Sequence, residues 1–265
     1  MSKTKAVAKT NGNEVAGLSD FEKAAAGIGT GMENVGASDL LIPRLTIIQS
    51  NSPQVVKSKP EYDKNAKAGM IWDVGLEEGW DDPVLFLPVH YVKEWLEWAP
   101  RNSGKGLANI HKTDSILLET TRDEKNKPVL SNGNYIAETA QFYGLNLTAG
   151  GRRSFLPMAS TQLKKARRLL TLSSSEKVQR PDGSEFTPQL FYRQYVFTTV
   201  PENNAEGDWM GWKVERGDEL TKLPNWQSIM ADVASFRKSL TSGAVKGDLA
   251  PDDHSPAPVS PDGAM

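Results

Sequence analysis

The sequence predicts a mainly β domain with flanking helices, an α+β fold in a single unit. Short apolar segments bounded by turn residues recur along the middle of the chain, which is typical of strands. Only two long segments follow the helical period instead. Residues 1–35 and the Pro-rich, mildly acidic residues 244–265 contain few large apolar side chains, so we expect a mostly disordered N-terminal arm and a flexible C-terminal tail. One domain, over residues 36–243, is left between them.

Strands are expected in the order in which the apolar segments appear. They cover residues 39–49, 68–75, 83–100, 140–150, 152–160 and 190–200, and a return strand lies within residues 201–215 after a turn rich in Asn and Gly. The longest segment, residues 83–100, contains Pro88. Proline has no N–H for a sheet hydrogen bond, so we expect Pro88 at a sheet edge or at a bulge.

The first expected helix begins at Ser160 or Thr161 and ends near Leu172. Its apolar side chains fall on one arc and its cations on the opposite side, at Lys164, Lys165, Arg167 and Arg168. The second expected helix covers residues 225–243, with Gly243 at its C-terminal cap. One helix between the third and fourth strands is the element order of a five-stranded OB barrel, so we predict an elaborated OB-fold-like barrel.

Charge is strongly segregated in a chain whose formal net charge is only −2. No acidic residue lies between Glu138 and Glu176, whereas Arg152, Arg153 and the four helix cations do. Acids cluster instead at residues 73–82, which we interpret as a solvated loop. Such segregation indicates a partner of definite sign. The alternative interpretation of the cations is a solvated helix face.

Residues suited to catalysis or metal binding are scarce. The chain has no cysteine, and His90, His111 and His254 have no metal-site spacing. Residues 99–106 lack the first glycine and the hydroxyl residue of a phosphate-binding loop. No apolar run reaches the length of a membrane span, and the N-terminus lacks a secretory signal. We therefore expect a protein that is not an enzyme, uses no cofactor or metal and does not enter a membrane.

Aromatic and basic side chains alternate on the longest expected strand. Strand geometry places Tyr91, Lys93 and Trp95 on one face and Trp98 on the other, and Arg101 and Lys105 follow in the loop. Single-stranded nucleic acid is bound by such a combination, because aromatic rings stack on bases while cations contact phosphates. The alternative is that these aromatic side chains belong to the core.

Several segments resemble, in order, the single-stranded DNA-binding proteins of tailed bacteriophages: residues 39–55, 69–74, 84–101, 160–168 and 191–212. The resemblance spans about residues 38–240. It implies an OB-fold protein of the infected host's cytoplasm that coats single-stranded DNA during phage replication and recombination, with a C-terminal tail that contacts replication or transcription proteins. The implied DNA-binding residues are Tyr91, Lys93, Trp95, Trp98, Arg101, Lys105, Arg152, Arg153, Lys164, Lys165, Arg167 and Arg168.

Two other functions remain open at this level. One is a phage structural or assembly protein, and the other is a replication or transcription accessory factor whose main partner is a protein. The oligomeric state and the preference between DNA and RNA are not predicted by the sequence.

Overall fold

The computed structural model describes residues 20–25, 28, 31, 34, 41–81, 83–100, 103–204, 207–245 and 247. The chain divides into two units, residues 1–40 and 41–265. In the first unit residues 20–25 are helical. Most of the expected N-terminal arm, and the expected tail beyond Gly247, lie outside the described residues.

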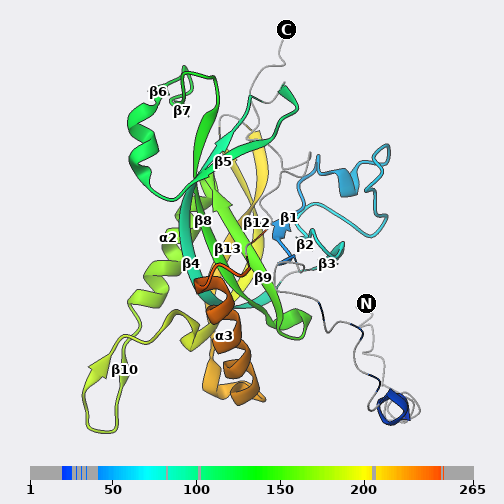
Figure 1. The fold of residues 1–265 in the computed structure, drawn as a ribbon, viewed down its shortest axis with the longest axis vertical. Helices are drawn as coiled ribbons and strands as arrows, with labels where there is room; N and C mark the ends of the chain where they lie inside the picture. Colours follow the sequence, from blue (N-terminus) through cyan, green and yellow to red (C-terminus); the bar gives the residue numbers. More distant parts are fainter. Residues whose placement is uncertain are drawn as a thin grey trace, which may run out of the picture. The chain divides into compact units, whose positions relative to one another are not determined.

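The second unit is built on an eight-stranded antiparallel sheet that curls into a half-barrel (Figure 1). Its main path runs β13-β12-β4-β8-β7-β6, with β5 paired to β4 and β9 paired to β8. The strands are β4 (Val84–Trp98), β5 (Leu107–His111), β6 (Thr121–Arg122), β7 (Pro128–Val129), β8 (Tyr135–Asn146), β9 (Arg152–Ala159), β12 (Arg193–Asn204) and β13 (Gly207–Glu219).

Four of these strands form a Greek key. In space β12 lies beside β4, β4 beside β8, and β8 beside β9, so the fourth strand along the chain returns to the side of the first. The pairing of β4 with β8 runs from Phe86 to Trp98 and is broken by a register shift between Pro88 and His90. Pro88 thus occupies a bulge, as predicted, although β4 is a central strand.

A small second sheet lies against the open side of the half-barrel. It consists of β1 (Leu45–Ile47), β2 (Ile71–Asp73) and β3 (Glu78–Trp80), and β1 contacts both β9 and β13. The Phe155 N–H of β9 donates to the Pro43 carbonyl at 2.9 Å. The small sheet therefore covers the gap between β9 and β13. These two strands are not paired with each other in the part of the chain that the structure describes.

Two hydrophobic cores lie on opposite faces of the sheet. The inner core joins residues such as Phe86, Phe142 and Tyr195 to the helix α2 (Leu163–Ser174). The outer core joins residues such as Tyr143 and Phe155 to the helix α3 (Trp226–Thr241). The strands alternate between the two cores because successive side chains of a strand point to opposite faces.

The mainly β fold with flanking helices is as predicted, and each expected strand overlaps an observed one, although β8, β12 and β13 extend beyond the expected bounds. Both expected helices are present, and Gly243 follows α3 with a φ of 72°. The short strands β3, β5, β6 and β7, and the hairpin of β10 (Val178–Gln179) and β11 (Glu185–Phe186), were not predicted. The predicted tail begins in contact with the domain, because Val245 packs on the outer core and the Gly247 N–H donates to the Tyr143 hydroxyl at 3.3 Å.

Candidate nucleic-acid interface

The basic helix α2 docks by its apolar stripe. Its sequence of Leu, Lys, Ala and Arg residues consists of strong helix formers. Ala166 and Leu169 are buried in the inner core, and Leu163 and Leu170 pack against it. Lys164, Arg167 and Arg168 are exposed on the other side. The predicted division of this helix into an apolar and a basic face is confirmed.

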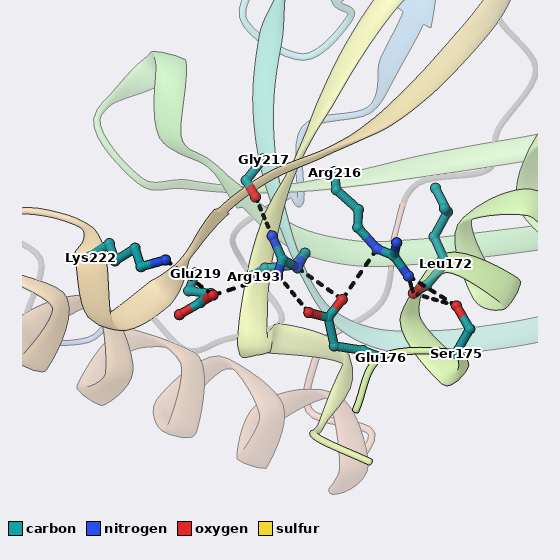
Figure 2. Close-up of polar contacts among 8 residues, drawn as sticks. All are labelled: Leu172, Ser175, Glu176, Arg193, Arg216, Gly217, Glu219 and Lys222. Atoms are coloured by element: carbon teal, nitrogen blue, oxygen red, sulfur yellow. Dashed lines mark hydrogen bonds and ion pairs between the residues drawn. The ribbon is translucent and has the colours of Figure 1, made fainter. Parts of the chain in front are cut away.

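An ion cluster at the end of α2 holds the helix in place (Figure 2). The Glu176 carboxylate contacts Arg193 at 2.6 Å and Arg216 at 3.2 Å, and Arg216 also donates to the Leu172 carbonyl at 2.8 Å. Arg193 and Glu176 are each only 14% exposed. Because β12 and β13 carry the two arginines, the C-terminal end of α2 is joined to both strands.

The four cations of α2 differ in their partners. Lys165 forms an ion pair with Glu202 of β12, whose carboxylate also accepts from the indole N–H of Trp209 at 3.0 Å. The Arg168 Nε–H donates to the Val214 carbonyl at 3.2 Å. Lys164 and Arg167 form no ion pair with any residue that the structure describes. These two charges are therefore available to a ligand.

The aromatic-basic face of β4 has the predicted alternation. Tyr91 packs on Phe142 with ring centroids 5.1 Å apart, and the Lys93 ammonium lies 5.0 Å from the centre of the Trp95 ring. Lys93 also lies 4.0 Å from Glu138 on β8, a separation at which an exposed pair contributes little. All these side chains share the face of the inner core.

Trp95, one of the expected DNA-binding residues, is buried, so the alternative interpretation that the aromatic side chains belong to the core applies to it. Its side chain is only 6% exposed and packs with Ile116 and Ile136 in a third, small core. Ile116 belongs to the 3-10 helix η4 (Asp114–Glu119), which lies in an insertion between β5 and β6. The inserted segment covers the ring, so Trp95 can stack on a base only if η4 moves.

Tyr91 packs against the inner core, to which the apolar stripe of α2 also belongs. Burial raises the pKa of the Tyr91 hydroxyl, the Glu138 carboxylate raises it further, and the Arg167 guanidinium lowers it. We group Tyr91 and Lys93 of β4 with Lys164 and Arg167 of α2 under the name α2–β4 surface, since α2 docks on the core that Tyr91 packs against and all four side chains are half-buried or exposed.

Arg152 and Arg153 do not join this surface. Arg152 is held at 2.7 Å by Glu78 of β3 and lies 3.6 Å from Asp73. Arg153 points to the other face of β9, where its guanidinium lies 5.2 Å from the centre of the Phe236 ring of α3. Arg152 and Arg153 therefore lie on opposite faces of the sheet, because successive side chains of a strand alternate in direction.

The remaining predicted residues lie farther along β4. Trp98 packs against the outer core, on the face opposite Lys93. Lys105 is exposed in the loop after β4, roughly 20 Å from Tyr91 by the rise of a strand. Arg101 lies outside the described residues.

Three of the four described acids at residues 73–82 are exposed, as expected of a solvated loop, but Asp73 is not. Asp73 is fully buried, and its carboxylate accepts from the backbone N–H groups of Gly75 at 3.0 Å and Leu76 at 3.1 Å. Burial raises its pKa. Among the described residues no group of three or more His, Cys, Asp and Glu side chains could hold a metal ion.

Another aromatic-basic surface, which our sequence interpretation missed, lies in the loop before β2. Tyr62 is 38% exposed there, between Lys57, Lys59 and Lys64, which are exposed. The signal that could have identified it is an aromatic residue among lysines in a segment rich in turn residues.

Comparison with known proteins identifies the family. Residues 9–246, most of the chain, match the Pam3 phage gp34-like proteins, and the chain belongs to this family. Searches of curated proteins and of solved structures found no match. None of the helices in the described residues is both long enough and apolar enough to cross a membrane.

Proposed function

We propose that this phage protein binds single-stranded DNA without sequence specificity and acts in phage DNA replication and recombination in the host cytoplasm. The observation that carries the proposal is the α2–β4 surface. Lys164 and Arg167 have no ion-pair partner among the described residues, and they share this surface with Lys93 and the half-buried Tyr91 ring. Cations beside an aromatic ring suit a flexible chain of phosphates and unpaired bases.

Low base specificity follows from the side chains of α2. Direct readout of adenine uses Asn or Gln, and no such residue stands among the exposed cations of the helix. Gln162, just before the helix, is engaged with β13, where its side-chain oxygen accepts from the backbone N–H of Trp212 at 2.9 Å. The contacts left to α2 are charge contacts with phosphates, which carry no sequence information.

The proposal includes an OB-type barrel. Strands β4, β8, β9, β12 and β13 would be its five strands, and α2 stands between the third and the fourth. OB folds bind oligonucleotides at strands 2 and 3 and at the loops between strands 1–2 and 4–5. Here α3 packs on the outer face of β8 and β9, at Tyr143 and Phe155. We therefore place the DNA on the α2 side, with the insertion at residues 99–134 at one end.

A protein partner is the second candidate function. Leu118, in the inserted helix η4, is 90% exposed, and Ile110 on β5 is 41% exposed. Exposed apolar side chains of this kind favour contact with another protein. An accessory or assembly role of this type needs no affinity for oligonucleotides.

A fluorescence titration with dT oligonucleotides of increasing length tests the proposal. The decisive variant is Lys164→Gln/Arg167→Gln, and its matched control is Lys222→Gln/Lys238→Gln, which removes the same charge beside α3. If both α2 side chains contact phosphates, the log–log salt slope should fall by about 1.4, because each contact contributes about 0.7 on single strands. The control should keep the wild-type slope.

The outcome separates the two candidate functions. No length-dependent binding by the wild-type protein would exclude the DNA-binding proposal and favour the protein partner. Binding with an unchanged slope in the α2 variant would keep the function but remove α2 from the interface.

A further inference from the structure

The loop between β1 and β2 is held in a defined conformation. Its two ends are joined where the Gly69 N–H donates to the Ile48 carbonyl at 2.8 Å. Within it the Asp63 N–H donates to the Gln54 carbonyl at 2.9 Å, and the Tyr62 N–H to the Lys59 carbonyl at 3.2 Å. Residues 50–69 therefore present Tyr62 and its neighbouring lysines from a hydrogen-bonded frame.

This loop is also fixed to β13. The Gln49 side chain donates to the Met210 carbonyl at 3.0 Å and accepts from the Met210 N–H at 2.8 Å. The Thr199 hydroxyl of β12 donates to the Gly69 carbonyl at 2.7 Å. The two hydrogen bonds of the Gln49 side-chain amide therefore fix the base of the loop to β13.

The same edge of β13 carries the start of α2. Gln49 binds Met210, the next contact along the edge is from Gln162 to Trp212, and the one after that is from Arg168 to Val214. These contacts fall on alternate residues of one strand, so the loop base and α2 lie next to each other along β13.

The exposed residues of the loop repeat the chemistry of the α2–β4 surface. The Tyr62 ring is 38% exposed, and Lys57, Lys59 and Lys64 form no ion pair with any described residue. Lys67 differs, because it is paired with Asp81 at 2.8 Å. The loop also carries two acids, Glu61 and Asp63. The Asp63 carboxylate accepts a hydrogen bond from the Asn65 N–H at 2.8 Å.

We propose that this loop is a second contact surface for single-stranded nucleic acid, on which Tyr62 stacks with a base and Lys57, Lys59 and Lys64 contact phosphates. The inference rests on the proposed function and extends it, because one strand would pass from α2 along the β13 edge to the loop. Oligonucleotides long enough to reach both surfaces would then bind more tightly than short ones.

The test uses the full chain and a series of dT oligonucleotides. Tyr62→Ala should lower affinity for the long oligonucleotides at least fivefold, the loss of about one stacked base. Lys57→Gln/Lys59→Gln should reduce the salt slope for long oligonucleotides by about 1.4. Both variants should bind the shortest oligonucleotides as the wild type does. Tyr62→Phe, which keeps the ring, should restore long-oligonucleotide binding and controls for folding.

The outcomes distinguish the second surface from the function itself. If wild type binds and Lys164→Gln/Arg167→Gln is impaired, but the loop variants match wild type at every length, the loop is not part of the interface and the proposed function stands. If the wild-type protein binds no oligonucleotide, both proposals fail. A photo-crosslink from 5-iodouracil in a long oligonucleotide to Tyr62 would support the loop contact directly.

Discussion

Tyr91 and Trp95 lie on the same face of β4, yet their surroundings differ. Strand alternation predicts the shared face from the sequence alone, because it depends only on local geometry. It cannot predict that Trp95 is covered, since the cover is Ile116 in an insertion that reaches back over the strand. At the scale of single residues the sequence therefore predicts orientation but not exposure.

We expect Trp95→Ala to destabilise the fold. Truncating a buried Trp removes apolar contacts and leaves a cavity, at a typical loss of about 3–5 kcal/mol. Urea unfolding followed by circular dichroism would measure the change. A variant as stable as the wild type would contradict the burial of Trp95 under η4.

A pH-dependent contribution to stability is expected from Glu97. The Asn134 amide, which donates to its carboxylate at 2.6 Å, holds the pKa of Glu97 below its ordinary value of 4.5, and His111 and Asn132 add to this effect. A carboxyl with a lowered folded-state pKa stabilises the fold above its unfolded-state pKa, and this stability is lost as the pH falls through the folded-state pKa.

Glu97→Gln should therefore be less stable than wild type at pH 7, by about 1–3 kcal/mol for a hydrogen-bonded charged group. The difference should shrink as the pH falls below about 4.5. Urea titrations of both proteins at several pH values measure it. A difference that stays constant down to pH 3 would rule out the Glu97 carboxylate as its source.

At the scale of elements, the long strands and both helices follow from apolar periodicity. The two-residue strands do not, because two residues carry no detectable period, as in β6, β7 and β10. The position of α2 on the sheet could not be predicted from the sequence alone. Its apolar stripe predicts that it docks, but the Glu176 cluster that fixes its end depends on Arg193 and Arg216, which come from two later strands.

We expect Glu176→Gln to lower stability by about 1.5–3 kcal/mol, since charged hydrogen bonds to both arginines are weakened. The change also removes a negative charge near α2. DNA affinity of the folded variant at low salt should therefore be equal to or higher than that of wild type. Thermal unfolding and an oligonucleotide titration check the two parts, and full stability would show that the cluster does not anchor α2.

At the scale of the whole molecule, a stretch without acids in the sequence is not a region without acids in space. Arg152 meets Glu78, and Lys165 meets Glu202, both across long separations in the chain. Of the six cations that suggested the interface, Lys164 and Arg167 make neither an ion pair nor a side-chain hydrogen bond with a described residue, whereas Arg153 and Arg168 are held by hydrogen bonds. The kind of ligand could be proposed from the sequence, whereas the surface had to be found in the folded chain.

The preference for single strands over duplex tests the central claim most directly. Wild-type protein is titrated with a dT oligonucleotide and with a duplex of equal length at several salt concentrations. A surface of cations and an aromatic ring, without a base-reading helix, predicts at least about tenfold tighter binding to the single strand, because stacking adds to the phosphate contacts only when bases are unpaired. Equal affinity for the duplex, or no binding to either, would contradict it.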